Sequence, residues 1–171
     1  METKTVVLVI APQEFRDEEF IETRKVLEEA GFRVQVASKT KDTAIGKHGT
    51  EVVPDITLAD INTETTDALV FIGGRGCSVY YQDPRALGLA KIMHNAGKVV
   101  AAICAAPVIL ANAGILQGGM ATCDVSVANE MKKKGTVCTG KPVEVDDRVI
   151  TGQNVDAAKS FGQAIADRLR K

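Results

Sequence analysis

The chain has 171 residues, of which 45% are hydrophobic and 25% charged, and its formal net charge is −1 at pH 7. This length and composition predict one globular domain, spanning residues 1–171, with a full hydrophobic core. The near-neutral charge argues against nucleic acid or an anionic membrane surface as a partner, and no apolar stretch reaches the length that spans a bilayer.

The first half of the chain alternates apolar, β-branched runs with one amphipathic segment. The run TVVLVIA at residues 5–11 predicts the first strand, and Asp17 is the expected N-cap of a helix that ends before Gly31. We predict a loop at 12–15, a helix at 18–30, strands at 32–38 and 68–72, a β-arm at 42–54 and a helical turn at 58–61.

The second half continues the alternation with shorter strands. We predict helices at 84–96, 107–113, 125–134 and 157–170, a buried strand at 98–103, a strand end at 121–124, and short strands at 137–138, 143–145 and 149–151. This alternation predicts a doubly wound α/β sandwich with a mainly parallel central sheet. Ligands of such folds bind beyond the carboxyl ends of the strands, where segments 11–19 and 73–77 and Cys104 are expected to meet.

The termini and the cysteine spacing indicate a cytoplasmic protein. Glu2 and Lys4 precede only a short apolar run, which is not typical of a signal peptide. The four cysteines lie far apart and form no CxxC pair, which favours reduced thiols. With only two histidines, His48 and His94, we expect no metal site.

Cys104 lies where the predicted strand at 98–103 turns sharply into a helix that starts at Pro107. Unpaired N–H groups and the positive end of a helix dipole favour an anion at such a turn, and this environment lowers the pKa of a thiol. The position therefore suits a nucleophilic cysteine, although taken alone it slightly favours an inert one. The alternative is a small, inert core cysteine, which is the commoner role of a buried thiol.

Three motifs carry a resemblance to a known family: AAICAAP at 101–107, IGGRG at 72–76 and EFRDEEF at 14–20. In this order they resemble the ThiJ/PfpI superfamily, which implies a flavodoxin-like fold with a reactive cysteine at a strand–helix elbow. The resemblance pairs Cys104 with a glutamate of the first helix, Glu19 in preference to Glu18. A carboxyl group buried beside a thiolate is held protonated and can serve as a general acid or base. Without the resemblance, Glu19 reads as a solvated glutamate of a first helical turn.

The glycine-rich segment after the third large strand is the expected oxyanion site. Gly73 and Gly74 let backbone N–H groups approach a ligand closely, and the resemblance adds the N–H of Ala105. The alternative to an oxyanion site is a purely structural role, in which the glycines are needed only to form a tight turn. Arg75 can bind a carboxylate or phosphate, although simple exposure is the commoner state of arginine.

The chain also departs from the family pattern. PfpI-type peptidases carry histidine directly after the cysteine, where this chain has Ala105, which argues against a Cys–His peptidase. Relatives place a polar residue opposite the cysteine at the position of Asp124, which reads either as an accessory group or as the N-cap of the helix that follows. Cys77 and Cys123 are either thiols that resolve an oxidised Cys104 or inert fillers.

The resemblance implies glyoxalase-type or deglycase-type chemistry on a small aldehyde or a glycated substrate, with Cys104 as nucleophile, Glu19 as proton carrier and no cofactor. The first alternative is a redox-sensing or chaperone-like stress protein with an oxidisable Cys104. The second is a PfpI-type peptidase. The family also implies a homodimer or a higher homo-oligomer.

Overall fold

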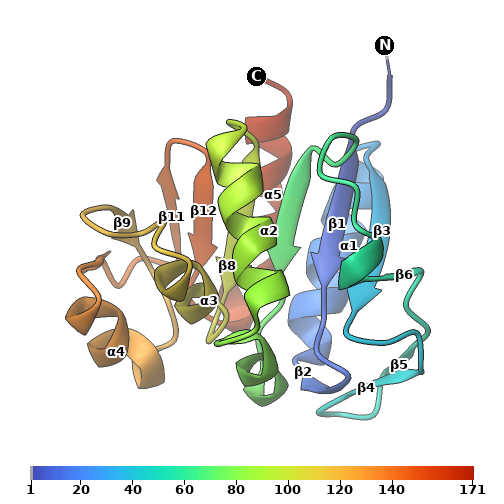
Figure 1. The fold of residues 1–171 in the computed structure, drawn as a ribbon, viewed down its shortest axis with the longest axis horizontal. Helices are drawn as coiled ribbons and strands as arrows, with labels where there is room; N and C mark the ends of the chain where they lie inside the picture. Colours follow the sequence, from blue (N-terminus) through green and yellow to red (C-terminus); the bar gives the residue numbers. More distant parts are fainter. Residues whose placement is uncertain (1) are drawn as a thin grey trace.

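The computed structural model describes residues 2–171 and contains a central sheet of seven strands with helices on both faces (Figure 1). The strand order is β11-β12-β8-β7-β1-β3-β6; within this sheet β11 runs antiparallel to its neighbour β12, and the other neighbouring strands pair in parallel. The strands are β1 (Thr5–Val9), β3 (Arg33–Ser38), β6 (Ile56–Thr57), β7 (Ala68–Phe71), β8 (Val99–Ile103), β11 (Val143–Asp146) and β12 (Val149–Gly152). The predicted α/β fold with a mainly parallel sheet is confirmed.

The two faces of the sheet bury separate apolar clusters. Val7 and Val9 of β1 join one cluster, while Val6 and Leu8 join the other, because successive side chains of a strand point to opposite faces. Both sets are fully buried, as expected for a strand inside a parallel sheet.

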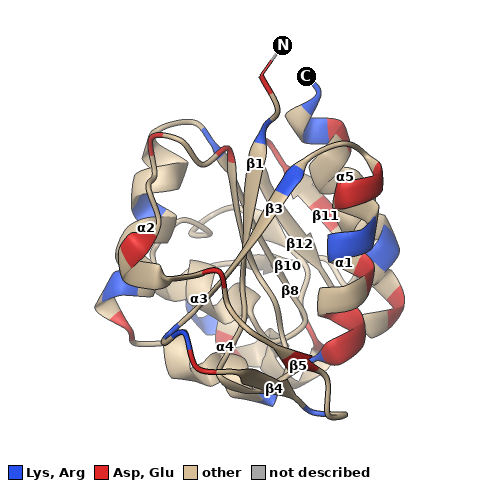
Figure 2. Cartoon of the chain, turned by 90° about the vertical axis from the view of Figure 1, so that its right-hand side faces the viewer, with Lys and Arg blue, Asp and Glu red and all other residues tan. Residues whose placement is uncertain are grey.

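Four α-helices cover these faces in pairs. The helices α1 (Asp17–Glu29) and α5 (Ala158–Leu169) pack against each other on one face, and α2 (Pro84–Asn95) and α3 (Pro107–Asn112) lie on the other. Charged residues of both signs occur along the exposed sides of α1 and α5 (Figure 2). No helix among residues 2–171 combines the length and the apolar character needed to cross a bilayer.

Smaller elements extend the carboxyl edge of the sheet, which lies opposite the two chain termini (Figure 1). One small sheet joins β2 (Gln13–Phe15), β4 (Ala44–Gly46) and β5 (Glu51–Val52), and another joins β9 (Met120–Ala121) and β10 (Val137–Cys138). The remaining elements are α4 (Ala128–Lys133) and the 3₁₀ turns η1 (Leu58–Asp60), η2 (Arg75–Tyr80), η3 (Val125–Val127) and η4 (Val155–Ala157).

Three local predictions are wrong. Residues 12–15 were expected to form a loop, but Gln13 pairs with Ile45 of the distant β-arm, which makes this segment strand β2. The expected helix at 125–134 begins with the 3₁₀ turn η3 and becomes α-helical only at Ala128. Asp17 is the first residue of α1 rather than its N-cap, because its carboxylate accepts hydrogen bonds from the β-arm instead.

Candidate functional site

Cys104 lies at the turn between β8 and α3 with a backbone φ of +66°. This left-handed conformation is unfavourable for a side chain other than glycine, and it persists only where the surroundings enforce it. Neighbouring elements supply the restraints: Gly152 O accepts from the N–H of Cys104 (2.9 Å), the Asp124 N–H donates to Cys104 O (2.7 Å), and the Tyr81 hydroxyl donates to Ala105 O (2.9 Å). The predicted sharp turn is therefore a nucleophile elbow in geometry.

The elbow opens into a pocket of about 420 Å³ at the carboxyl edge of the sheet. Cys104 is half-buried and its side chain is part of the pocket wall. The lining residues come from the segments that follow β1, β7 and β8 and from two more distant loops: Glu14, Arg16, Lys47, Gly74, Arg75, Cys104, Ala105, Asp124 and Ser126. The segments expected to meet at this edge do so.

Glu19 is buried directly behind the elbow, with 1% of its surface exposed. Its Oε1 accepts a hydrogen bond from the Gly73 N–H (3.1 Å), and its carboxyl group lies beside the Cys104 side chain. Within residues 2–171, Oε2 accepts no hydrogen bond from an N–H or O–H group. Burial raises the pKa of Glu19 to about 7, so a proton on this carboxyl group is accessible near neutral pH.

The Cys104 thiol does not have the lowered pKa that its position predicts. Burial raises its pKa, the negative charges of Glu19 and Asp124 raise it further, and a hydrogen bond from the Gly74 N–H lowers it. The helix that follows has only six residues. Because Cys104 and Glu19 are in contact, they titrate as a pair. A thiolate at Cys104 is therefore more accessible when Glu19 is protonated, because the negative charge of Glu19 raises the pKa of the thiol.

The glycines after β7 are required by close contacts. A Cβ on Gly73 would lie 2.5 Å from Ile103 O and 2.7 Å from Cys104 Cβ. Gly74 has a φ of +102°, and a Cβ there would lie 2.5 Å from Arg16 N. Because Gly73 and Gly74 carry no side chain, the Gly74 N–H can approach the Cys104 sulfur. Gly74 and Ala105 both line the pocket at this point. Both readings of this segment, tight turn and donor site, fit the geometry.

The accessory residues separate into two groups. Arg75 is exposed and lines the pocket. Asp124 also lines it, and its carboxylate caps η3 by accepting from the Ser126 N–H (3.0 Å), so the capping prediction holds at a residue that also faces the site. Cys77 is buried beside the Tyr81 hydroxyl (3.9 Å), and Cys123 contacts Cys138; neither lines this pocket.

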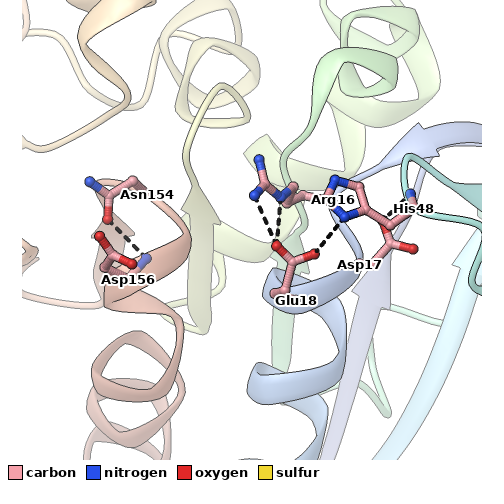
Figure 3. Close-up of polar contacts among 6 residues, drawn as sticks. All are labelled: Arg16, Asp17, Glu18, His48, Asn154 and Asp156. Atoms are coloured by element: carbon pink, nitrogen blue, oxygen red, sulfur yellow. Dashed lines mark hydrogen bonds and ion pairs between the residues drawn. The ribbon is translucent and has the colours of Figure 1, made fainter.

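A charged network fixes one rim of the pocket (Figure 3). The Arg16 guanidinium donates to Glu18 Oε2 (2.9 Å), and His48 Nδ1 lies 3.8 Å from Glu18 Oε1. The Asp17 carboxylate accepts from the backbone N–H groups of His48 (2.8 Å) and Thr50 (3.0 Å). Although burial alone would raise its pKa, these hydrogen bonds lower the pKa of Asp17 to about 2. The β-arm is thereby held to α1 and places Lys47, between its two strands, in the pocket wall.

Sequence reasoning missed five residues of this site, one of which is Ser126 in the pocket wall. Tyr81, Arg16 and Lys47 are brought in by tertiary contacts that leave no local pattern. Glu14 lines the pocket with a φ of +55°, a strained conformation that only coordinates reveal. Among residues 2–171, no group of three or more histidine, cysteine, aspartate or glutamate side chains is arranged to hold a metal ion.

Comparison with known proteins places this geometry in context. The DJ-1/PfpI family pattern matches residues 4–168. The chain is 34% identical to Deglycase PfpI of Pyrococcus furiosus, over 86% of this chain and 89% of that protein, and 30% identical to the glutathione-independent glyoxalase DJR-1.2 of Caenorhabditis elegans, over 97% and 89%. The crystal structure of a ThiJ/PfpI domain protein from Brachyspira murdochii superposes with a TM-score of 0.96 at 32% identity, covering 99% of this chain and 98% of that one.

Proposed function

The chain belongs to the DJ-1/PfpI family, and we propose that it is a cysteine-dependent enzyme that acts on small reactive carbonyl compounds or their adducts. One observation carries this proposal. The strained, pocket-facing Cys104 contacts Glu19, a buried carboxyl group with one oxygen free to hold a proton. The glyoxalase and deglycase names of the two relatives described above support the same chemistry.

The first step of the proposed reaction is addition of sulfur to an aldehyde carbon. The Cys104 thiolate, present while Glu19 is protonated, attacks the carbonyl group, and the oxygen that becomes negative takes up the proton of Glu19 to give a hemithioacetal. The N–H groups of Gly74 and Ala105 are the donors placed to stabilise that oxygen. The Glu19 carboxylate is then free to accept a proton.

The second step moves a proton between two carbon atoms of the bound substrate. With a 2-oxoaldehyde, Glu19 removes the proton from the carbon that carries sulfur and returns it to the neighbouring carbon, while the hydroxyl proton moves to the oxygen of that neighbouring carbon, which leaves a thioester of Cys104. Water hydrolyses the thioester to a 2-hydroxy acid and regenerates the thiol. A carboxyl group whose pKa lies near 7 suits both directions of this transfer.

The experiment measures conversion of methylglyoxal to lactate by purified protein, with product identified by NMR. Cys104→Ser and Glu19→Gln should each lower kcat/KM at least about 100-fold, as expected for loss of a nucleophile or a general base. Glu18→Gln is the matched carboxyl control on the same helical turn and should retain most activity. Equal losses in the two glutamine variants would reject the assignment of Glu19.

The alternative function is a redox sensor, and the half-exposed position of Cys104 in an open pocket favours it. Uptake of peroxide at Cys104, one oxidation per chain, together with no turnover of any 2-oxoaldehyde, would support this role and reject the enzyme. A peptidase is less favoured because Ala105 provides no imidazole beside the thiol. We also propose that the chain forms a homodimer, which sedimentation of the purified protein tests.

A further inference from the structure

A second pocket lies beside the small sheet β9–β10 and shares no lining residue with the Cys104 pocket. Its volume is about 160 Å³. Two of the four cysteines of the chain, Cys123 and Cys138, line it together, and the proposed function uses neither. The other lining residues are Val125, Ala128, Lys132, Thr139, Gly140 and Gln153.

The strand register explains why these two thiols meet. Strands β9 and β10 are parallel, with Cys138 opposite Ala121, and the Thr139 N–H donates to Ala121 O (2.9 Å). Cys123 follows Ala121 by two residues, so its side chain returns to the same face of the sheet as that of Cys138. The two side chains line the same pocket, Cys138 is near enough to raise the pKa of the Cys123 thiol, and Cys138 Sγ lies 3.7 Å from Ala128 O.

The two thiols differ in access to solvent. Cys123 has 4% of its surface exposed, and burial, followed by the neighbouring Cys138, raises its pKa to about 12. Cys138 is half-buried and lines the same pocket. Lys132 is the one charged side chain in this lining, and its positive charge lowers the pKa of the Cys123 thiol against the larger opposing effect of burial. An external oxidant is therefore expected to react with the more exposed Cys138 before the buried Cys123.

We propose that Cys123 and Cys138 are a modification site that forms a reversible intramolecular disulfide when the protein meets a hydroperoxide. The Cys138 thiolate attacks one peroxide oxygen and breaks the O–O bond, which gives a sulfenic acid at Cys138 and, with hydrogen peroxide, hydroxide that takes up a proton to become water. The Cys123 sulfur then attacks the sulfenic sulfur. Its proton leaves with the sulfenic hydroxyl group as a second water, and both sulfurs end in one disulfide.

The disulfide would link β10 to the segment that precedes Asp124 and would close the loop that contains α4. Closing this loop restricts the unfolded chain, so oxidation should raise the melting temperature by about 5 °C. A small dithiol reductant should reverse both the bond and the shift. The neighbouring residue, Asp124, donates its N–H to Cys104 O, so the alkylation rate of Cys104 provides a further readout.

The test uses tryptic peptide mapping of intact protein after treatment with hydrogen peroxide, under non-reducing conditions. Cys138 is released on the peptide 135–148, whereas Cys104 and Cys123 share the peptide 99–132. The Cys104→Ser variant therefore makes the assignment unambiguous, and it keeps the experiment independent of the proposed catalysis. We expect these two peptides to be joined by a disulfide in Cys104→Ser protein as in the wild type.

Single variants test the order of the two steps. In Cys123→Ser protein, a sulfenic acid at Cys138 should accumulate and react with a 1,3-diketone probe, whereas Cys138→Ser protein should show at most a tenth of that labelling at Cys123. Circular dichroism confirms that each variant is folded, and the wild-type peptide map does not depend on either variant. A disulfide between Cys104 and Cys123, or no joined peptides at peroxide concentrations that oxidise Cys104, would overturn the proposal.

Discussion

Asp17 and Glu19 lie two positions apart in the first turn of α1, and both carboxyl groups are almost fully buried. Their ionisation is nevertheless opposite. Asp17 accepts two backbone N–H hydrogen bonds and its pKa falls to about 2, whereas Glu19 accepts one from Gly73 and its pKa rises to about 7. Burial raises the pKa of both groups and hydrogen bonds lower it; at Asp17 the hydrogen bonds outweigh burial, whereas at Glu19 burial outweighs them.

The largest effect should follow from Glu19→Gln. We expect turnover of methylglyoxal to fall at least about 100-fold, because no group remains to carry the proton. At pH 8, alkylation of Cys104 by iodoacetamide should become faster, because the negative charge of Glu19 raises the pKa of the thiol in the wild type. A stopped assay for lactate and mass spectrometry of the alkylated peptide measure the two rates.

Opposite changes in these two rates are specific to a proton carrier. A variant that only damaged the fold would lower turnover and make every cysteine more reactive, so alkylation of buried Cys77 serves as the control. Slower alkylation of Cys104 in Glu19→Gln would contradict the coupling of the two groups.

The two carboxyls should also impose opposite pH dependences on stability. Folded Glu19 keeps a proton that the unfolded chain releases above about pH 4.5, so the free energy of unfolding should fall by about 3 kcal/mol as pH rises from about 4.5 to about 7. Folded Asp17 stays ionised down to about pH 2, so its contribution is present above about pH 4 and lost as pH falls through 2. Urea unfolding at a series of pH values measures both.

Glu19→Gln should flatten the neutral branch of this profile, and Asp17→Asn should flatten the acid branch. If either variant changed the acid and the neutral parts of the stability profile equally, the two carboxyl groups would titrate together. Their pKa values would then not be set independently, contrary to what we infer.

Asp17→Asn should destabilise the protein at pH 7 by about 2 kcal/mol, because charged hydrogen bonds to two backbone N–H groups are weakened. The β-arm that carries Lys47 should loosen at the same time. Amide hydrogen exchange at residues 46–50 should speed up more than exchange in β8. Uniform acceleration across the chain would show that the effect is global rather than local.

The smallest effect should come from Glu18→Gln, which removes the partly exposed ion pair with Arg16. Such pairs contribute up to about 1 kcal/mol, so we expect a change of about 0.5 kcal/mol in urea unfolding. A loss above about 2 kcal/mol would move Glu18 into the structural role that we assign to Asp17.

The sequence predicted the parts of this molecule that depend on local patterns. The continuous apolar run before Cys104 and the position of Pro107 were enough to place the elbow, because a buried strand and a helical first turn have local signatures. The choice of Glu19 over Glu18 came from the family resemblance, since a run of acidic residues gives no physical reason to prefer one of them.

The rest depends on contacts between distant segments. Gln13 becomes part of a strand only because Ile45 lies beside it, and Tyr81 reaches the elbow from the far end of η2. The direction of the Cys104 pKa shift was missed for the same reason. The expected helix dipole is a local property, whereas burial and the charge of Glu19 arise from packing.

Gly73 has a consequence for how this site can vary. A single methyl group there would press at once on the carbonyl of Ile103, on Glu19 and on the Cβ of Cys104. A mutational scan of this position should therefore tolerate nothing but glycine, even though its backbone φ is ordinary. Chemical diversification of the site has to begin at the outer wall, with Arg16, Lys47 and Arg75, and leave this one hydrogen atom in place.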